Sequence, residues 1–285
     1  MTFTTRFAPS PTGPLHLGHA YSALLAHDMA QAAQGRFLLR IEDIDRSRAR
    51  TEWEELIFED LIWLGIAWEA PVMRQSEQMD RYRSALEMLW NQGLLYACSC
   101  NRRDILAAAT APQEGGSPLV GPDGIVYPGT CRHAGARAPA ACPPEAALRL
   151  DMAAALRRLG LSEIRIDERI HQGPCVKSAG EIIETIGDIV IARRDMGTSY
   201  HLSVVLDDAH QGITDVVRGA DLFEASFIHA VLQRLLGLPA PRYHHHRLIR
   251  DAAGKRLAKR DDAKAIRKYR AEGLRPEDIR AMVGL

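Results

Sequence analysis

Two histidines three positions apart, His16 and His19, are the residues of this chain best suited to phosphate chemistry. They lie at the end of a Pro/Gly-rich string, residues 7–19, with the sequence Phe-Ala-Pro-Ser-Pro-Thr-Gly-Pro-Leu-His-Leu-Gly-His, and a helical pattern follows. Imidazole N–H groups and the unpaired backbone N–H groups of a first helical turn both favour a bound phosphate. Gly13 and Gly18 let a nucleotide approach the backbone closely. The whole string therefore predicts a nucleotide site, whereas an isolated His-x-x-His is more often an incidental part of a turn.

A second cationic segment lies near the other end of the chain, at residues 256–260, with the sequence Arg-Leu-Ala-Lys-Arg. Residues 241–270 around it hold eleven Lys and Arg but three Asp, although the whole chain has a formal charge of zero. We predict a local phosphate-binding surface here. A solvated helix face around residues 264–270 is the alternative interpretation.

Together the two segments resemble the two signatures of class I aminoacyl-tRNA synthetases in their glutamate form. Residues 7–19 are similar to the HIGH signature, and residues 256–260 are similar to the KMSKS loop, with Arg256 in place of the first lysine and Ala258 in place of the serine. The resemblance implies activation of glutamate by ATP, with Mg²⁺ accompanying the nucleotide. It implies catalytic roles for His16, His19 and Lys259, and ATP binding by His16, Gly18, His19, Arg256 and Lys259.

Three of the five cysteines lie in a pattern that suits a metal ion. Cys98 and Cys100 form a Cys-x-Cys pair, and Cys131 ends the later sequence Tyr127-Pro-Gly-Thr-Cys. A closed structural zinc site needs four ligands. The residues alone leave Tyr127 and His133 open as the fourth ligand, and buried thiols without a metal as the alternative. A shortened branch of the family, the glutamyl-Q-tRNA(Asp) synthetases, has Cys-x-Cys followed by Tyr-x-x-x-Cys, so this resemblance implies one structural Zn²⁺ per chain, held by Cys98, Cys100, Tyr127 and Cys131.

Cationic side chains are expected around a substrate that carries two carboxylates, because arginine presents a planar fork of donors. Arg6 precedes the first signature, and Arg218 lies in the segment 212–219, which resembles the glutamate-site segment of the family. The resemblance gives Glu42 the role of receiving the substrate ammonium group and Tyr200 the role of closing the pocket. The expected glutamate-binding residues are Arg6, Ala8, Ser10, Glu42, Tyr200 and Arg218.

The hydrophobic pattern predicts alternating strands and helices along the chain. A strand at 36–41 is followed by helices over about 51–64 and 77–92, and the segments 186–192 and 200–206 are expected as further strands. With a phosphate loop after the first strand, this rhythm suits an α/β fold with a doubly wound parallel sheet whose ligand lies at the strand ends. The resemblance adds the expected domains: Rossmann-like halves at 1–97 and 186–250, a zinc-containing acceptor-type insertion at 98–185, and a KMSKS-like loop with a short helical remnant at 251–285.

The composition is that of an ordinary soluble protein with a sizeable core, since 46% of the 285 residues are apolar and 25% are charged. No apolar run approaches the length of a membrane helix, and the first residues lack the layout of a signal peptide. We therefore expect a cytoplasmic protein without a membrane partner, and we expect a monomer.

The resemblance to the glutamyl-Q branch covers nearly the whole chain. Only 25 residues follow Arg260, so we expect no anticodon-binding domain. The implied substrates are L-glutamate, ATP and tRNA(Asp) containing queuosine, and the implied reaction transfers glutamate to queuosine in the anticodon loop. Because no motif reads queuosine directly, two alternatives stay open: a minimal glutamyl-tRNA synthetase that charges a tRNA 3′ end, and a non-catalytic tRNA-binding paralogue.

Overall fold

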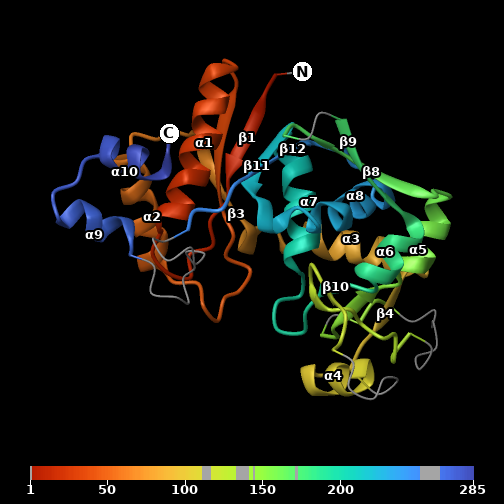
Figure 1. Ribbon diagram of the computed structural model, residues 1–285. Coiled ribbons are helices and arrows are strands. Elements are labelled where there is room, and N and C mark those ends of the chain that lie inside the picture. Colours follow the sequence, from red (N-terminus) through yellow and green to blue (C-terminus); the bar gives the residue numbers. More distant parts are fainter. Residues whose placement is uncertain (1, 111–116, 133–140, 144, 171–172, 251–263) are drawn as a thin grey trace.

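A parallel sheet runs through the middle of the molecule in two parts (Figure 1). The computed structural model describes residues 2–110, 117–132, 141–143, 145–170, 173–250 and 264–285. The first part of the sheet has the order β1-β2-β3, and the second has the order β11-β12-β8-β9, in which β9 runs antiparallel to β8. The strands are β1 (Thr4–Phe7), β2 (Arg36–Ile41), β3 (Glu69–Arg74), β8 (Glu163–Glu168), β9 (Gly173–Ser178), β11 (Asp215–Gly219) and β12 (Arg242–His246).

The two parts of the sheet meet where β1 and β11 lie side by side. The backbone N–H of Thr214 donates to the carbonyl of Thr4 over 2.9 Å, and the N–H of Thr4 donates to the hydroxyl of Thr214 over 2.9 Å. The sheet continues from β1 to β2 on one side and from β11 to β12 on the other, so the strand order reverses here. Such a switch point leaves a crevice at the carboxyl ends of the two strands. β1 and β11 end there at Phe7 and Gly219.

The helices pack around the sheet in two hydrophobic cores. One core joins α1 and α2 to the C-terminal helices α9 and α10, and the other joins α3, α5, α6, α7 and α8 (Figure 1). Among the described residues, no helix combines the length and the apolar character that crossing a membrane requires. These helices are α1 (Leu17–Ala32), α2 (Thr51–Trp63), α3 (Met79–Asn91), α5 (Met152–Leu159), α6 (Ala179–Thr185), α7 (Tyr200–His210), α8 (Ala225–Leu235), α9 (Ile266–Ala271) and α10 (Pro276–Val283).

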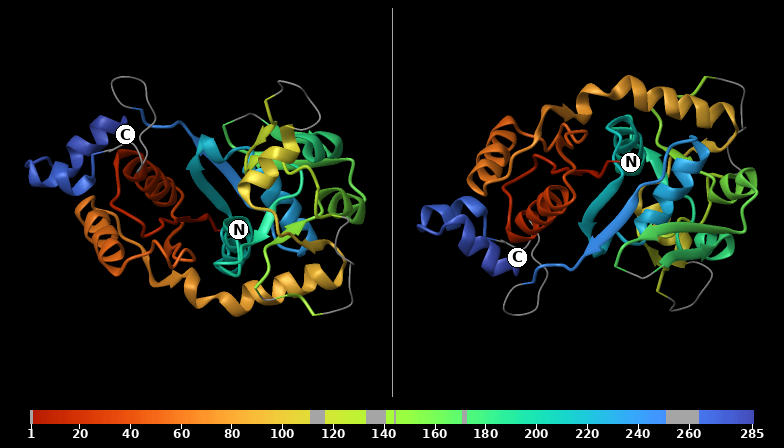
Figure 2. Two further views of the ribbon diagram at one scale, coloured as in Figure 1. Left: turned by 90° about the horizontal axis from the view of Figure 1, so that it is seen from below. Right: turned by 90° about the horizontal axis from the view of Figure 1, so that it is seen from above.

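A smaller antiparallel sheet lies at the end of the molecule away from α9 and α10 (Figures 1 and 2). Its strand order is β10-β7-β4, and helix α4 and the hairpin β5-β6 accompany it. The elements of this region are β4 (Leu95–Ala97), α4 (Arg102–Thr110), β5 (Val120–Gly121), β6 (Gly124–Ile125), β7 (Leu148–Leu150) and β10 (Val190–Ala192). Two single turns of 3₁₀-helix, η1 (Gln75–Glu77) and η2 (Ala220–Leu222), complete the described elements.

Most of the predicted elements are confirmed. The strand at 36–41 is β2, and the helices expected over 51–64 and 77–92 are α2 and α3. The doubly wound parallel sheet is confirmed by the strand order and by the switch point at β1 and β11. The strand expected over 186–192 is shorter, because only its last three residues form β10. The domain boundaries stay predictions; β8, which lies within 98–185, pairs with β12 in the parallel sheet.

The prediction of a strand at 200–206 is wrong, because this segment forms the first part of α7. The hydroxyl of Ser199 accepts the N–H of Leu202 over 3.4 Å and caps the helix. All residues from 201 to 208 are buried, so this stretch of the helix has no exposed polar face that would reveal a 3.6-residue period. A short apolar run with β-branched residues then looks like a buried strand when only the sequence is read.

Candidate active site and cysteine cluster

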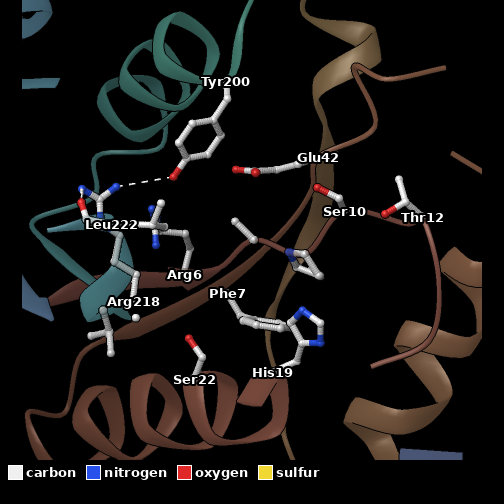
Figure 3. A pocket seen from close by; sticks show the side chains of 14 residues that line it. Arg6, Phe7, Ser10, Thr12, His19, Ser22, Glu42, Tyr200, Arg218 and Leu222 are labelled. Carbon is white, nitrogen blue, oxygen red and sulfur yellow. Dashed lines mark hydrogen bonds between the residues drawn. The ribbon is translucent and has the colours of Figure 1, made fainter. Parts of the chain in front are cut away.

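A cavity of about 350 Å³ opens at the switch point between β1 and β11 (Figure 3). All six residues predicted to bind glutamate line it, and so does His19, whereas His16 and Gly18 are outside its described lining. Of the remaining lining residues, Ser22 and Leu222 lie outside the segments that the sequence had singled out. The full lining is Arg6, Phe7, Ala8, Pro9, Ser10, Thr12, His19, Ser22, Glu42, Tyr200, Val217, Arg218, Gly219 and Leu222.

His16 and His19 hold the first turn of α1 together. The N–H of Gly18 donates to Nδ1 of His16 over 3.1 Å, and the N–H of His16 donates to Nδ1 of His19 over 3.2 Å. Because each Nδ1 accepts a hydrogen bond, each neutral ring carries its proton on Nε2, from which it can donate to a phosphate. A Cβ on Gly18 would lie 3.0 Å from Cε1 of His16, so the glycine leaves room for the capping ring.

Arg6 approaches the cavity with its charge already paired. Its Nε and Nη2 donate to the two carboxylate oxygens of Asp208 over 2.8 and 3.2 Å. The fully buried Arg40 donates to Asp208 over 2.7 Å and to Glu42 over 3.2 Å. Burial acts to raise the pKa of Asp208, but Arg6 and Arg40 hold it below its ordinary value. Glu42 is thus the cavity-facing end of a buried ion network, and burial raises its pKa despite the neighbouring Arg40.

Arg218 lies on another wall of the cavity, and neutral groups hold it. Its Nε donates to Nε2 of His245 over 3.2 Å, and its Nη2 donates to the hydroxyl of Ser226 over 2.6 Å. Its Nη1 lies 3.2 Å from Nδ1 of His229 and 3.5 Å from the hydroxyl of Tyr200, the contact dashed in Figure 3. Burial and then the Arg218 charge lower the pKa of both histidines, that of His245 to about 4. At neutral pH Arg218 therefore makes no ion pair within the described part of the chain.

The remaining predicted pocket residues come from the signature loop and from α7. Ala8 and Ser10 come from the loop after β1, and the Tyr200 ring extends from the first residue of α7 (Figure 3). A second cavity of about 370 Å³ shares Ser10, Glu42 and Tyr200 with the first and continues toward Arg193 and Asp123. A second reactant could therefore reach a substrate in the first cavity through the second cavity.

Arg256 and Lys259, the predicted cations of the second signature, lie outside the described residues. The described chain resumes at residue 264, and Ala265 pairs with His16 in an isolated antiparallel bridge. The chain shortly after the second signature is thereby attached to the N-cap of α1, which lies within the first signature.

Cys98, Cys100 and Cys131 bring their sulfur atoms within 4.8 Å of one another. The Tyr127 hydroxyl lies 3.5 Å from Sγ of Cys98 and 3.3 Å from Sγ of Cys100, and it accepts the N–H of Cys131 over 2.9 Å. Adjacent ligand atoms of a tetrahedral zinc ion with bonds of about 2.3 Å lie about 3.8 Å apart. The donor set and spacing of the four predicted ligands therefore fit Zn²⁺. The competing His133 lies outside the described residues.

Arg149 places a positive charge beside this cluster. Its Nε donates to Sγ of Cys98 over 3.3 Å, and its guanidinium carbon lies 3.8 Å from the centre of the Tyr127 ring. The Asp188 carbonyl accepts a further hydrogen bond from Arg149 over 2.9 Å and fixes its direction. A cation here stabilises the deprotonated sulfur that metal binding requires. Sequence reasoning missed Arg149, which is separated from Cys98 by 51 positions.

The sequence analysis also missed the residues that hold the two pocket arginines, Asp208 for Arg6 and His245 for Arg218. Asp208 ends an apolar run as the second of two adjacent acidic residues, and His245 is the middle of three adjacent histidines. Acidic residues at the end of a buried run need cationic partners, so the pair at 207 and 208 was a usable signal. The run of three histidines did not indicate a contact with Arg218, because only the register of β11 and β12 brings His245 opposite Arg218.

The family "tRNA synthetases class I (E and Q), catalytic domain" matches residues 2–123 and 145–285. This match includes both signature segments, the cavity and most of the described fold. The chain belongs to this family. As a member of the class I tRNA synthetases, it has the catalytic-domain architecture that its motifs predicted.

Several named relatives match this synthetase over nearly its whole length. A glutamyl-Q tRNA(Asp) synthetase of Rhodobacter capsulatus is 63% identical over 286 residues, which cover 99% of each chain. Another, from Nocardia farcinica, is 41% identical over 98% of this chain and 82% of its own. One from Deinococcus radiodurans is 41% identical over 99% of this chain and 88% of its own.

Solved structures of glutamate–tRNA ligases share the fold of this synthetase. One from Elizabethkingia meningosepticum, in complex with its amino acid, superposes with a TM-score of 0.75 at 27% identity. A second, from Elizabethkingia anophelis, gives a TM-score of 0.77 at 26% identity. Both matches cover all of this chain, which spans 61% of the length of each of those structures.

Proposed function

We propose that this synthetase activates glutamate with ATP and transfers the glutamyl group to queuosine in the anticodon loop of tRNA(Asp). The observation that carries the proposal is the 63% identity, over 99% of both chains, with the glutamyl-Q tRNA(Asp) synthetase of Rhodobacter capsulatus. The cavity at the switch point supports it, because it combines a buried cation, a carboxylate and a phosphate-binding helix terminus.

Glutamate enters this cavity with its charges matched. Arg218 receives the side-chain carboxylate, because its own partners are neutral. Glu42 receives the ammonium group, and Tyr200 closes the pocket above it. His19 lies apart from Arg218 in Figure 3, so the α-carboxylate is directed toward the signature loop. Arg6, Ala8 and Ser10 complete the site, with Arg6 acting through its ion pair.

ATP binds along the first turn of α1, next to Gly18, and against the second signature. An oxygen of the α-carboxylate attacks the α-phosphorus, the bond to the bridging oxygen breaks, and pyrophosphate leaves with the electron pair. His16 and His19 donate from Nε2 to phosphate oxygens, while Arg256 and Lys259 stabilise the developing charge. Mg²⁺ supplies neutralisation of phosphate charge when it accompanies ATP.

The second step uses the neighbouring cavity. A hydroxyl of queuosine attacks the acyl carbon of glutamyl-adenylate, the bond to the phosphate oxygen breaks, and AMP leaves. The two cavities share a wall at Ser10, Glu42 and Tyr200. This arrangement supports transfer from the second cavity, because the acceptor can approach from there without displacing the nucleotide from α1.

The cysteine cluster holds a structural Zn²⁺ in this proposal, with Cys98, Cys100, Tyr127 and Cys131 as ligands. It organises the insertion at 98–185, between the catalytic halves at 1–97 and 186–250, where RNA docks. Replacing Cys98 with Ser is expected to lower bound zinc, measured by elemental analysis, and to lower the unfolding temperature. Unchanged metal content in that variant would remove Cys98 from the ligand set. We further propose that the protein acts as a cytoplasmic monomer.

The decisive experiment is transfer of labelled glutamate to purified tRNA(Asp) with and without queuosine, beside tRNA(Glu). Nuclease digestion then locates the label in the anticodon fragment or at the 3′ end. Label in the anticodon fragment that requires queuosine is the expected result. Label at the 3′ end of tRNA(Glu) would instead identify a minimal glutamyl-tRNA synthetase. Absence of glutamate-dependent pyrophosphate exchange would identify a non-catalytic paralogue.

A further inference from the structure

The cation that faces the substrate is held by a hydrogen-bond chain across three neighbouring strands. The register of the parallel sheet sets Arg218 on β11 opposite His245 on β12. Nε of Arg218 donates to Nε2 of His245 over 3.2 Å, and Nδ1 of the same ring is hydrogen-bonded to the carboxylate of Glu168 on β8. The Glu168 side chain is fully buried, and its other oxygen accepts the N–H groups of Ile170 and His245 over 3.2 Å each. The carboxylate is therefore fixed before it meets the imidazole.

A second chain approaches Arg218 from the helices. Nη1 of Arg218 lies 3.2 Å from Nδ1 of His229, and Nε2 of His229 lies 3.1 Å from Nδ1 of His201. Nε2 of His201 lies 3.4 Å from the carboxylate of Asp123. One choice of tautomers satisfies every contact: each imidazole accepts on Nδ1 and donates from Nε2. This chain, like the first, ends on a carboxylate that does not touch Arg218.

A neutral acceptor directs a guanidinium group without cancelling its charge. A carboxylate in direct contact with Arg218 would form a buried ion pair and compete with the substrate carboxylate for the same donors. Arg6 is in that situation with Asp208. An imidazole avoids the competition, provided that its bare nitrogen faces the arginine. The distant carboxylate ensures this, because the N–H of the ring must donate to it.

We propose that His245 and Glu168 form a positioning pair for Arg218, which aims the guanidinium at the substrate carboxylate and keeps its charge available. The inference rests on the proposed function, since that carboxylate is taken to be the side chain of glutamate. Neither residue lines the described cavity, so both act through Arg218. The pair therefore determines selectivity for a carboxylate over the neutral amide of glutamine.

Two matched variants of His245 separate the contacts that its two nitrogens make. In His245→Gln the side-chain amide extends to the position of Nε2, so an acceptor for Arg218 is retained. In His245→Asn the amide extends only to the position of Nδ1, so the contact with Glu168 is retained and that with Arg218 is lost. Glu168→Gln is a third variant, in which the shape is kept and the charge that sets the tautomer is removed.

The assay is glutamate-dependent pyrophosphate exchange with the full chain, with KM determined for glutamate and for ATP. His245→Asn is expected to raise KM for glutamate at least tenfold, to leave KM for ATP unchanged, and to reduce the preference for glutamate over glutamine. His245→Gln is expected to stay within threefold of the parent, and Glu168→Gln to lie between them. Equal effects of the two His245 variants, or losses confined to kcat and thermal stability, would overturn the positioning role.

A spectroscopic measurement keeps this inference separate from the proposed function. Nitrogen NMR of the parent protein is expected to show His245 as the neutral tautomer with its proton on Nδ1. It is also expected to show a slowly exchanging signal from the Nε–H of Arg218, which disappears in Arg218→Lys. That signal should persist in His245→Gln and be lost in His245→Asn. A proton on Nε2 of His245 would overturn the positioning pair even in an active enzyme. Failure of the parent to exchange pyrophosphate would instead reject glutamate activation while leaving the NMR result to decide the pair.

Discussion

The two arginines of the cavity are held in opposite ways. Arg6 at the end of β1 shares the Asp208 carboxylate with the buried Arg40, so its charge is balanced inside the protein. Arg218 at the end of β11 is held by neutral groups, among them His245, and within the described residues it makes no ion pair. The same side chain therefore serves two purposes: the Arg6 side is a rigid ion network that places Glu42, and the Arg218 side keeps a charge available for a ligand.

The largest effect is expected from removing the unbalanced cation. Arg218→Ala should lower kcat/KM for glutamate by about 10³-fold, because truncating one partner of a buried, hydrogen-bonded charge pair costs about 4 kcal/mol. ATP binding should be unchanged. Pyrophosphate exchange and nucleotide titration measure the two quantities. Arg36→Ala is the control, since Arg36 forms a half-exposed pair with Glu69 at the start of β2, the end of the strand away from Glu42. Retained glutamate activation in Arg218→Ala would remove Arg218 from the site.

Breaking the balanced network should act mainly on stability. Asp208→Asn leaves Arg6 and Arg40 buried without their shared carboxylate, and we expect a loss of about 3–4 kcal/mol in the free energy of unfolding. Urea denaturation measures it. The control is Asp28→Asn, which breaks the partly exposed pair with Arg280 and should cost less than about 1 kcal/mol. Equal losses in the two variants would contradict the distinction between the network and a surface pair.

Asp60 on α2 is a buried carboxylate without a close partner in the described part of the chain. Neither oxygen has a hydrogen bond among the described residues, and Arg270 is 3.9 Å away. Burial raises the pKa of Asp60 to about 6, above its unfolded value near 3.8, so the folded state binds the proton more tightly. The stability this provides is complete below pH 4 and lost as the pH rises through 6. Asp60→Asn should therefore stabilise the protein by up to about 3 kcal/mol at pH 8.

The advantage of Asp60→Asn over the parent should disappear at pH 4, where the parent carboxyl is already protonated. Chemical denaturation at both pH values measures this difference. A variant that is less stable than the parent at pH 8 would indicate that the carboxylate is compensated in the folded protein.

The smallest effect concerns the neutral histidine beside Arg218. Burial and the Arg218 charge lower the pKa of His245 from 6.5 to about 4. Between these two pH values the imidazole is mostly protonated in the unfolded chain and mostly neutral in the folded chain. Stability therefore falls as the pH drops below 6.5, by about 1.5 kcal/mol from this group at pH 5. His245→Gln cannot titrate, and its unfolding free energy should fall less over that interval. If the unfolding free energies of parent and variant changed in parallel with pH, His245 would not be neutral in the folded protein.

Features carried by short stretches of sequence were predictable. Strand β2 has a compact apolar pattern, and the signature loop places His16 and His19 at a spacing at which each ring can accept a backbone N–H of the first helical turn. The cysteine cluster was found from motif spacing and resemblance, and the sulfur atoms do converge. Helix α7 was mistaken for a strand because burial on every side removes the period that marks a helix.

The amino-acid sequence specifies which chemical groups this synthetase has and where the two signatures begin. Which of the charges are balanced depends on the folded arrangement. Arg6 meets Asp208 across 202 positions, and Arg218 meets His245 across 27, through the packing of α7 and the register of β11 with β12. Burial then sets the pKa of each partner, because the cost of a buried charge depends on what surrounds it in the fold. Two arginines that look alike in the sequence thus acquire different roles.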